Sequence, residues 1–469
     1  MSLERKTRLF FRRNRLFLYQ RISSIQIIVS YYIVMTIVAL GLFYLPIFRQ
    51  PGSEASFIDL LFMAVSTISV TGLSTFPINE VFNQNGVVLL SILFQIGGLG
   101  IMMISTFFFI VSNRKISLKQ RQLIMTDMNQ PRLSGIVNLI RTTFLILISF
   151  QIIGGIIFGI HFKVKGFYDN WFDAFFNGFY QAISAVTNSG FDVTGHSIVP
   201  YAENVGFLLA IMFLIFIGGI GFPVIMDFRS WFLQKIKKKD LHQLPFRFSL
   251  FTKISVLSFV ILFIGGTIVI FLLEKNYMFQ NSSFSETLIT SMFYSATTRN
   301  AGLQIHDISD FQTTTLLIFS MLMFIGCSPS SVGGGVRTTT VMIIGLYLFS
   351  FLKSESRVNV FGRQIDNNDV QKAVIVFMLS LAMCFSSVII LTATEDFSLI
   401  SIIVEVASAF GTTGMSLGIT ADLSNFGKLV IGMLMFIGRI GMLYTLLLFV
   451  PKETRDLGYE YPTEKIIIG

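Results

Sequence analysis

Four short strings in the sequence share one pattern: a polar or small pair, a glycine, and then an apolar residue. A dehydrated cation needs oxygen ligands, and backbone carbonyls can replace its water shell. Glycine reaches the positive φ angles that turn successive carbonyls toward one axis without steric cost. The strings recur at intervals of 112 to 118 residues: SVTGLS (69–74), TNSGFD (187–192), RNAGLQ (299–304) and GTTGMS (411–416). Together they predict one ring of carbonyls that selects a cation.

The residues beside each glycine complete this predicted filter, because they supply or orient the neighbouring carbonyls. Any one glycine of this kind is most often a helix-ending cap. Its fourfold repetition behind short apolar segments favours the filter. The predicted filter residues are Val70, Thr71, Gly72, Asn188, Ser189, Gly190, Asn300, Ala301, Gly302, Thr412, Thr413 and Gly414.

Short apolar segments precede the glycines and must position them. They cover 57–71, 171–189, 284–301 and 397–413. They are too short and too polar at their ends to span a bilayer, so we expect re-entrant helices sheltered by protein or a watery cavity. Their C-terminal ends carry partial negative charge that favours a cation. Acids near their outer starts would cap the helices, attract cations, or both: Glu54, Asp173, Glu286 and Asp396.

Long apolar runs flank each short segment. Hydrophobic residues make up 53% of the 469-residue chain and charged residues 13%, against roughly 25% charge in soluble domains. About 20 residues cross a bilayer. The predicted fold is an all-α polytopic membrane protein with four span–pore-helix–span repeats in pseudo-fourfold arrangement. Its eight spans are 25–47, 86–111, 138–162, 204–233, 252–273, 313–350 (interrupted), 372–393 and 425–450.

The second span of each repeat carries its own recurring string. These strings are FQIGGLG (94–100), FIGGIG (216–221), FIGCSP (324–329) and FIGRIG (436–441). They align Gly98, Gly219, Cys327 and Arg439. A chance fourfold match of both sets of strings in the same order is very unexpected, so the repeat is the most specific feature of the sequence.

The basic residues predict the topology and the division of the chain. Seven lie between Met1 and Arg21 beside one acid. A long apolar span follows them, so a cytoplasmic anchor is favoured over nucleic-acid binding. Both termini are expected in the cytoplasm. The predicted segments are a basic N-terminus (1–24), repeat 1 (25–111), loop and repeat 2 (112–233), loop and repeat 3 (234–352), loop and repeat 4 (353–450) and a cytoplasmic tail (451–469).

These features resemble the Trk/Ktr/HKT superfamily of potassium transporters, and most closely the membrane subunit of the bacterial Ktr uptake system. The resemblance covers about residues 22–450 and depends on both sets of strings, the interrupted sixth span and Arg439. It implies potassium preference from Gly72, because serine at this position in the plant branch goes with sodium transport. It also implies a homodimer with one pore per chain, a cytosolic ring of nucleotide-binding regulatory subunits, and the bacterial cytoplasmic membrane.

The sixth span is interrupted by GCSPSSVGGGVRTTT, residues 326–340. Proline and clustered glycines do not continue a helix, and a broken helix at membrane depth borders a cavity. A phosphate-binding P-loop is rejected because its lysine is missing. The alternative is a kink used for packing. The resemblance implies an intramembrane gating loop, with gate residues Gly326, Cys327, Ser328, Gly333, Gly334, Gly335 and Arg439.

Arg439 falls in the middle of a span, where a charge is costly and usually functional. Two roles are equally open. It forms a structural ion pair with Glu405, an acid within a pore segment, or it repels ions and holds the loop.

Potassium uptake through the pore is the predicted function, with K⁺ as the transported ion and no covalent cofactor. A sodium-coupled or sodium-permeant porter, in which Na⁺ couples or activates transport, is the alternative. An enzyme would need clustered catalytic groups, and no paired carboxylates or histidines occur in the spans. A receptor or scaffold would not need four filter repeats.

Overall fold

The structure is a computed structural model of the chain. It describes residues 23–100, 118–127, 135–192, 195, 197–236, 246–449 and 462. The predicted basic N-terminus therefore lies outside the described residues almost entirely. The inner part of the second span (101–111) and the tail, apart from residue 462, also lie outside them.

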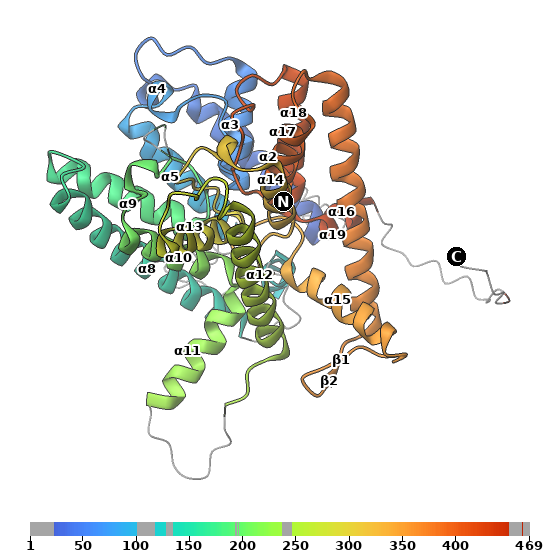
Figure 1. Cartoon of the computed structure of the whole chain (residues 1–469). Helices are drawn as coiled ribbons and strands as arrows, with labels where there is room; N and C mark the ends of the chain where they lie inside the picture. Colours follow the sequence, from blue (N-terminus) through green and yellow to red (C-terminus); the bar gives the residue numbers. More distant parts are fainter. Residues whose placement is uncertain are drawn as a thin grey trace, which may run out of the picture.

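Helices dominate the described chain, and they follow one another as four groups of three (Figure 1). Each group has one long helix followed by two shorter ones, in the predicted order. Repeat 1 holds α2 (Ser24–Phe43), α3 (Phe57–Ser69) and α5 (Gln84–Leu99); repeat 2 holds α8 (Ile136–Val164), α9 (Trp171–Thr187) and α10 (Val205–Gly219). Repeat 3 holds α12 (Leu250–Glu274), α13 (Phe284–Thr297) and α14 (Thr313–Phe324); repeat 4 holds α16 (Asn367–Thr394), α17 (Leu399–Gly411) and α18 (Asn425–Ile440).

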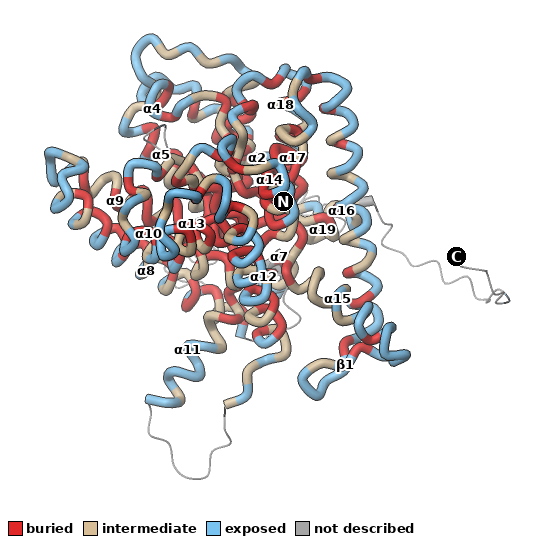
Figure 2. The backbone as a smooth tube through the Cα atoms, in the orientation of Figure 1, coloured by how far each residue is buried: buried red, intermediate tan, exposed pale blue. Residues whose placement is uncertain are grey.

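The first helix of every repeat is long and apolar enough to cross a membrane. Mean hydropathy is 2.1 for α2, 2.3 for α8, 2.9 for α12 and 2.7 for α16. Their outer faces leave large apolar side chains exposed, such as Ile37 at 61% and Phe385 at 67%. The short helices are mostly buried between them (Figure 2). This burial pattern suits a lipid-facing shell around a protein interior, and the predicted all-α membrane fold is confirmed.

Smaller elements lie within, between and after the repeats. They are α4 (Ile78–Val81), α7 (Leu118–Asp127), α11 (Phe222–Ile236), α15 (Thr338–Leu352), α19 (Met442–Phe449), η1 (Pro46–Phe48), η2 (Val199–Tyr201) and η3 (Ile308–Asp310). A hairpin of β1 (Asn359–Val360) and β2 (Arg363–Gln364) pairs Asn359 with Gln364 between repeats 3 and 4. No strand was expected there.

The second helices break at one aligned position, which corrects the prediction that only the sixth span is interrupted. The α10–α11 pair bends by 104° and the α18–α19 pair by 97°. Gly221 and Gly441 lie at these bends with φ of 98° and 96°, and Gly100 follows α5 with φ of 72°. Pro329 aligns with these glycines in repeat 3. The break therefore belongs to the repeat, since glycine adopts positive φ and proline ends a helix.

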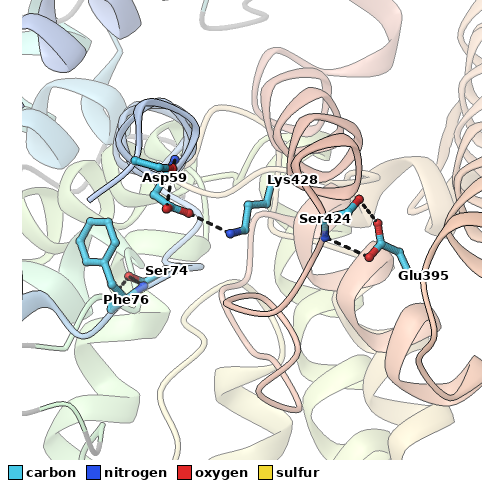
Figure 3. A network of polar contacts seen from close by, with 7 residues as sticks. Asp59, Ser74, Phe76, Glu395, Ser424 and Lys428 are labelled. Atoms are coloured by element: carbon cyan, nitrogen blue, oxygen red, sulfur yellow. Dashed lines mark hydrogen bonds and ion pairs between the residues drawn. The ribbon is translucent and has the colours of Figure 1, made fainter. Parts of the chain in front are cut away.

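Polar contacts at the outer ends join the first and second helices of each repeat. Asn83 donates to Ile47 at 2.9 Å, and His161 bonds to Asn204 at 2.9 Å. In repeats 3 and 4 the partner is a carboxylate: Glu274 accepts from the Gln312 amide at 3.1 Å, and Glu395 from the Ser424 amide at 3.0 Å (Figure 3). In repeats 3 and 4 the contact satisfies a backbone amide at the start of the second helix, where amides have no partner within the helix. In repeats 1 and 2 the side chain of the residue before the second helix makes the contact.

One ion pair joins the first repeat to the last. Lys428 of α18 lies 2.9 Å from the carboxylate of Asp59 in α3 (Figure 3). Their side chains are only 10% and 21% exposed. Because the two residues are far apart in the sequence, this pair fixes repeat 4 against repeat 1.

Candidate cation filter

One repeated hydrogen bond joins the loop after each short helix to the C-terminal end of that helix. Beyond α3, the Thr71 amide donates back to the Ser66 carbonyl at 2.9 Å. Ser189 and Thr413 make the same bond to residues five positions earlier, at 3.0 and 2.9 Å. In repeat 3 the Gly302 amide bonds Thr297 at 3.1 Å. The helix ends therefore set the direction in which each loop leaves.

Positive φ angles alternate along each loop. The glycines have φ of 92° at Gly72, 67° at Gly190, 64° at Gly302 and 92° at Gly414, as the strings predict. Two positions earlier, non-glycine residues also have positive φ: Val70 (60°), Asn188 (52°), Asn300 (110°) and Thr412 (54°). The sequence places these four residues in the filter but does not predict their positive φ angles. Asparagine tolerates this region, whereas a β-branched valine does so at a cost, and such strain gathers at functional sites.

The four loops touch in a closed ring that follows the order of the sequence. A methyl group on Gly190 would lie 2.6 Å from the Ala301 carbonyl oxygen and 3.3 Å from that of Thr413. Methyl groups on Gly72, Gly302 and Gly414 would overlap the carbonyl oxygens of Ser189, Thr413 and Thr71. Loop 1 thus contacts loop 2, loop 2 contacts loop 3, loop 3 contacts loop 4, and loop 4 returns to loop 1. All twelve predicted filter residues lie in these loops.

Side chains tie the loops to their helices and to one another. The Asn300 amide donates to both the carbonyl and the hydroxyl of Thr412, each at 2.9 Å, and so joins loops 3 and 4. Three buried oxygens near the ring have no hydrogen-bond donor among the described residues: Asn188 Oδ1, Asn300 Oδ1 and Thr413 Oγ1. A buried oxygen without a donor costs free energy unless another group binds it, and a cation would do so.

A cavity of about 950 Å³ opens onto the ring from one side. All four glycines line it, together with the carboxyl-bearing Asp192 and Asp307 and the hydroxyl-bearing Ser416 and Thr420. Carboxylates in a cleft raise the local concentration of cations. We call this cavity the outer vestibule.

The acids that the sequence placed at the mouth take other positions. Glu286 completes a capping box with Ser283, and Asp173 lies in the first turn of α9. Serines cap α3 and α17, so Glu54 and Asp396 are not caps. None of these four acids lines the outer vestibule. Asp192 was missed, although it stands two residues after Gly190 in its string.

The recurring glycines of the second helices pack against the ends of the short helices. A methyl group on Gly97, Gly218 or Gly438 would overlap the carbonyl oxygen of Ile68, Val186 or Phe410 respectively. Each of these carbonyls lies two residues before the first positive-φ residue of its loop. In repeats 1, 2 and 4 the two sets of strings are thus two sides of one contact, whereas Gly326 of repeat 3 packs against Gly334 of the loop 326–340.

The loop 326–340 lies against the face of the ring opposite the vestibule. A methyl group on Gly333 would come within 2.6 Å of the Asn300 side chain, and one on Gly334 within 2.5 Å of the Thr412 hydroxyl. Loop amides also reach the second helices: Ser328 donates to Gly219 at 3.1 Å, and Gly335 to Gly438 at 3.2 Å. The remaining predicted gate residues, Gly326 and Cys327, are buried, and Cys327 contacts the Arg299 carbonyl at 3.0 Å.

Of the two roles left open for Arg439, the structure favours contact with this loop, and the ion pair with Glu405 does not form. Its guanidinium donates to the carbonyls of Val332 in the loop and of Gly97 and Gly98 in α5, the last at 2.7 Å. Glu405 instead accepts hydrogen bonds from Ser416 and Thr420, both at 2.6 Å. The two charges face different elements, because Glu405 lies behind the vestibule whereas Arg439 contacts the loop. Carbonyl oxygens satisfy the buried cation in place of a carboxylate.

A second cavity of about 310 Å³ lies beyond the loop. Its lining includes Ser331, Gly335, Arg337 and Arg439, and no described residue lines both this cavity and the outer vestibule. The ring and the loop therefore stand between the two cavities. In the described part of the chain, no group of three metal-binding side chains occurs.

Comparison with known proteins shows the family of the chain. Residues 47–456 match the TrkH family model, described as "Cation transport protein". The chain is 42% identical over 452 residues to Ktr system potassium uptake protein D of Bacillus subtilis (strain 168), covering 96% of this chain and 98% of the relative. It is 33% identical to potassium/sodium uptake protein NtpJ of Enterococcus hirae, with the same coverage.

A solved structure shares the fold. The potassium transporter TrkH from Vibrio parahaemolyticus matches with a TM-score of 0.72 at 18% identity, over 92% of this chain and 86% of that one. The family is one of transporters and not of enzymes. The chain therefore belongs to the TrkH family of cation transport proteins.

Proposed function

We propose that this protein is the potassium-selective, ion-translocating subunit of a K⁺ uptake system. The observation that carries the proposal is the closed ring of four loops, each with positive φ at its glycine and each opening onto one acid-lined vestibule. Carbonyl oxygens of such a ring replace the water around a cation. The B. subtilis relative at 42% identity is named for potassium uptake.

Permeation would begin in the outer vestibule, where Asp192 and Asp307 attract cations. A cation would then lose water and bind the carbonyls of the twelve filter residues. The predicted gate residues would stop it there, because Gly333 and Gly334 fill the space beneath Asn300 and Thr412. Arg439 would hold this loop and add a positive barrier.

The gate proposal predicts the effect of releasing the loop. Arg439→Met removes the bonds to Val332, Gly97 and Gly98 but keeps an apolar side chain of similar length. We expect faster K⁺ flux through the purified protein, and faster flux again when residues 328–335 are deleted. Flux through folded protein that stays at the native rate in both variants would contradict a gating role.

The setting of the pore is also part of the proposal. We place the chain in the bacterial cytoplasmic membrane with both termini in the cytoplasm, as a homodimer bound to a cytosolic ring of nucleotide-binding regulatory subunits. Support comes from the name of the B. subtilis relative, which is called a potassium uptake protein of the Ktr system. The segment boundaries from 1–24 to 451–469 belong to the same proposal.

Flux in proteoliposomes tests the function. Purified protein is reconstituted, an inside-negative potential is imposed, and K⁺ uptake is measured in K⁺ and then Na⁺ gradients. We expect K⁺ uptake without added Na⁺. K⁺ uptake that requires Na⁺ would favour the sodium-coupled alternative, for which the E. hirae relative is a precedent by name. No flux of either ion would refute the pore.

A further inference from the structure

Glu405 is a buried acid without a cationic partner among the described residues. It lies in α17, nine residues before Gly414, and its side chain is 0% exposed. Ser416 donates to Oε2 and Thr420 to Oε1, each at 2.6 Å. Hydroxyl-to-oxygen hydrogen bonds measure about 2.5–3.0 Å. Each hydroxyl therefore donates to one oxygen of the Glu405 carboxyl group, away from the vestibule.

This orientation changes what the two hydroxyls present to the outer vestibule. A hydroxyl has one proton and two lone pairs. The Thr420 hydroxyl lies 2.6 Å from Glu405 and 3.0 Å from the Ser416 hydroxyl. If its one proton goes to the nearer Glu405, as the proton of Ser416 does, lone pairs of both hydroxyls are left for other partners. The Gly418 amide uses one lone pair of Ser416 at 3.1 Å. Both residues line the vestibule, so they offer it acceptor oxygens.

The other three loops lack this arrangement. Residues nine positions before their glycines are Met63, Gln181 and Phe293. At the position equivalent to Ser416, loop 1 has Ser74, whose hydroxyl donates to the Phe76 carbonyl in its own loop (Figure 3). Ser74 therefore shares the type and position of Ser416 without a carboxylate behind it.

We propose that Ser416 and Thr420 form an outer station for a partly dehydrated monovalent cation, above the filter and on one side of it. Glu405 is its positioning residue, because it orients both hydroxyls. The station would receive a cation from the vestibule before it reaches the carbonyls of Gly414 and its neighbours. This inference rests on the proposed cation-pore function.

Kinetics of uptake separate this station from the filter. Rb⁺ uptake is measured against concentration in proteoliposomes for the native protein and for Ser416→Ala, Ser416→Thr, Glu405→Gln and Ser74→Ala. Glutamine keeps the shape of Glu405 but offers one acceptor oxygen, so one hydroxyl loses its orientation. We expect KM to rise about tenfold, as loss of about 1.4 kcal/mol of binding implies, in Ser416→Ala and Glu405→Gln. Maximal rate and the preference for K⁺ over Na⁺ at saturation should stay near native.

The two remaining variants are matched controls. Ser416→Thr keeps the hydroxyl and Ser74→Ala removes one at the same position of loop 1, so both should keep the native KM. Equal KM values in Ser416→Ala and Ser74→Ala would overturn the station, as would a native KM in Glu405→Gln. Size-exclusion chromatography checks folding, and if Glu405→Gln does not fold, the Ser416→Ala and Ser416→Thr pair decides. No uptake by native protein would instead refute the pore itself.

Discussion

Replacement of Gly190 by alanine tests whether the four loops depend on one another. Gly190 has φ of 67°, where an alanine side chain costs roughly 1–2 kcal/mol. Its new methyl group would also lie 2.6 Å from the Ala301 carbonyl oxygen. Ordinary contact begins at 3.4 Å, so loops 2 and 3 must separate by about 0.8 Å. That movement displaces a carbonyl that we assign to the cation.

Alanine at Gly52 supplies the matched control. This residue also has a positive φ, 78°, but a methyl group there meets nothing within 4 Å. Both variants should lose similar stability from the backbone, whereas only Gly190→Ala should lose transport. We expect at least a tenfold lower K⁺ uptake, because misplacing a ligand by about 1 Å can reduce activity about 100-fold.

The assay compares uptake in proteoliposomes with the melting temperature of the same preparations. If Gly190→Ala transports K⁺ at the native rate while remaining folded, the ring of touching loops is not the selective element. If Gly52→Ala loses as much transport as Gly190→Ala, strain in the backbone and not contact between loops explains the loss.

Two further predictions concern stability. Lys428→Met should lower the melting temperature, because it leaves the Asp59 carboxylate unpaired and only 21% exposed. Breaking such a pair costs up to about 3 kcal/mol. Lys372→Met, which breaks a pair whose lysine is 59% exposed, should change the melting temperature little. Asp307→Ala should lower it at pH 7, because hydrogen bonds from Ser309 hold the pKa of Asp307 below its usual 3.8. A carboxyl with a lowered pKa stabilises the fold above that value, so the native and Asp307→Ala melting curves should converge as the pH falls below 3.8, and a constant difference would contradict this.

The architecture could be predicted from the sequence because two independent sets of strings, those of the filter and those of the second helices, both repeat four times. The glycines of the filter strings mark where positive φ is needed, and the glycines of the second helices mark where the short helices pack. Length and hydropathy then separate spans from short helices. The structure of each repeat follows from these local requirements, without knowledge of distant contacts.

Other features depend on directions that spacing does not encode. The sequence left two roles open for Arg439, an ion pair with Glu405 or contact with the loop, because opposite charges do not tell which side of a helix each residue faces. Two hydroxyls satisfy Glu405, and three carbonyls satisfy Arg439. The bends at Gly221 and Gly441 were missed although both glycines end the recurring strings. The residues on both sides of each bend are apolar, so composition alone predicts one continuous span.

The mouth of the pore shows the same limit. Acids were expected at the helix starts, because a helix N-terminus is a common place for them. The vestibule instead takes Asp192 and Asp307 from the loops that follow the glycines. Which loop side chains turn toward a cavity depends on how four separate loops meet, and no single string contains that information.

Anomalous diffraction from crystals of the protein grown with Tl⁺, a substitute for K⁺, tests the central claim most directly. The account predicts a Tl⁺ peak on the axis of the ring, coordinated by carbonyl oxygens from all four loops, with Gly72, Gly190, Gly302 and Gly414 around it. A further peak beside Ser416 would mark the outer station. Clear density for the ring without Tl⁺ inside it, or Tl⁺ bound only elsewhere in the protein, would contradict the account.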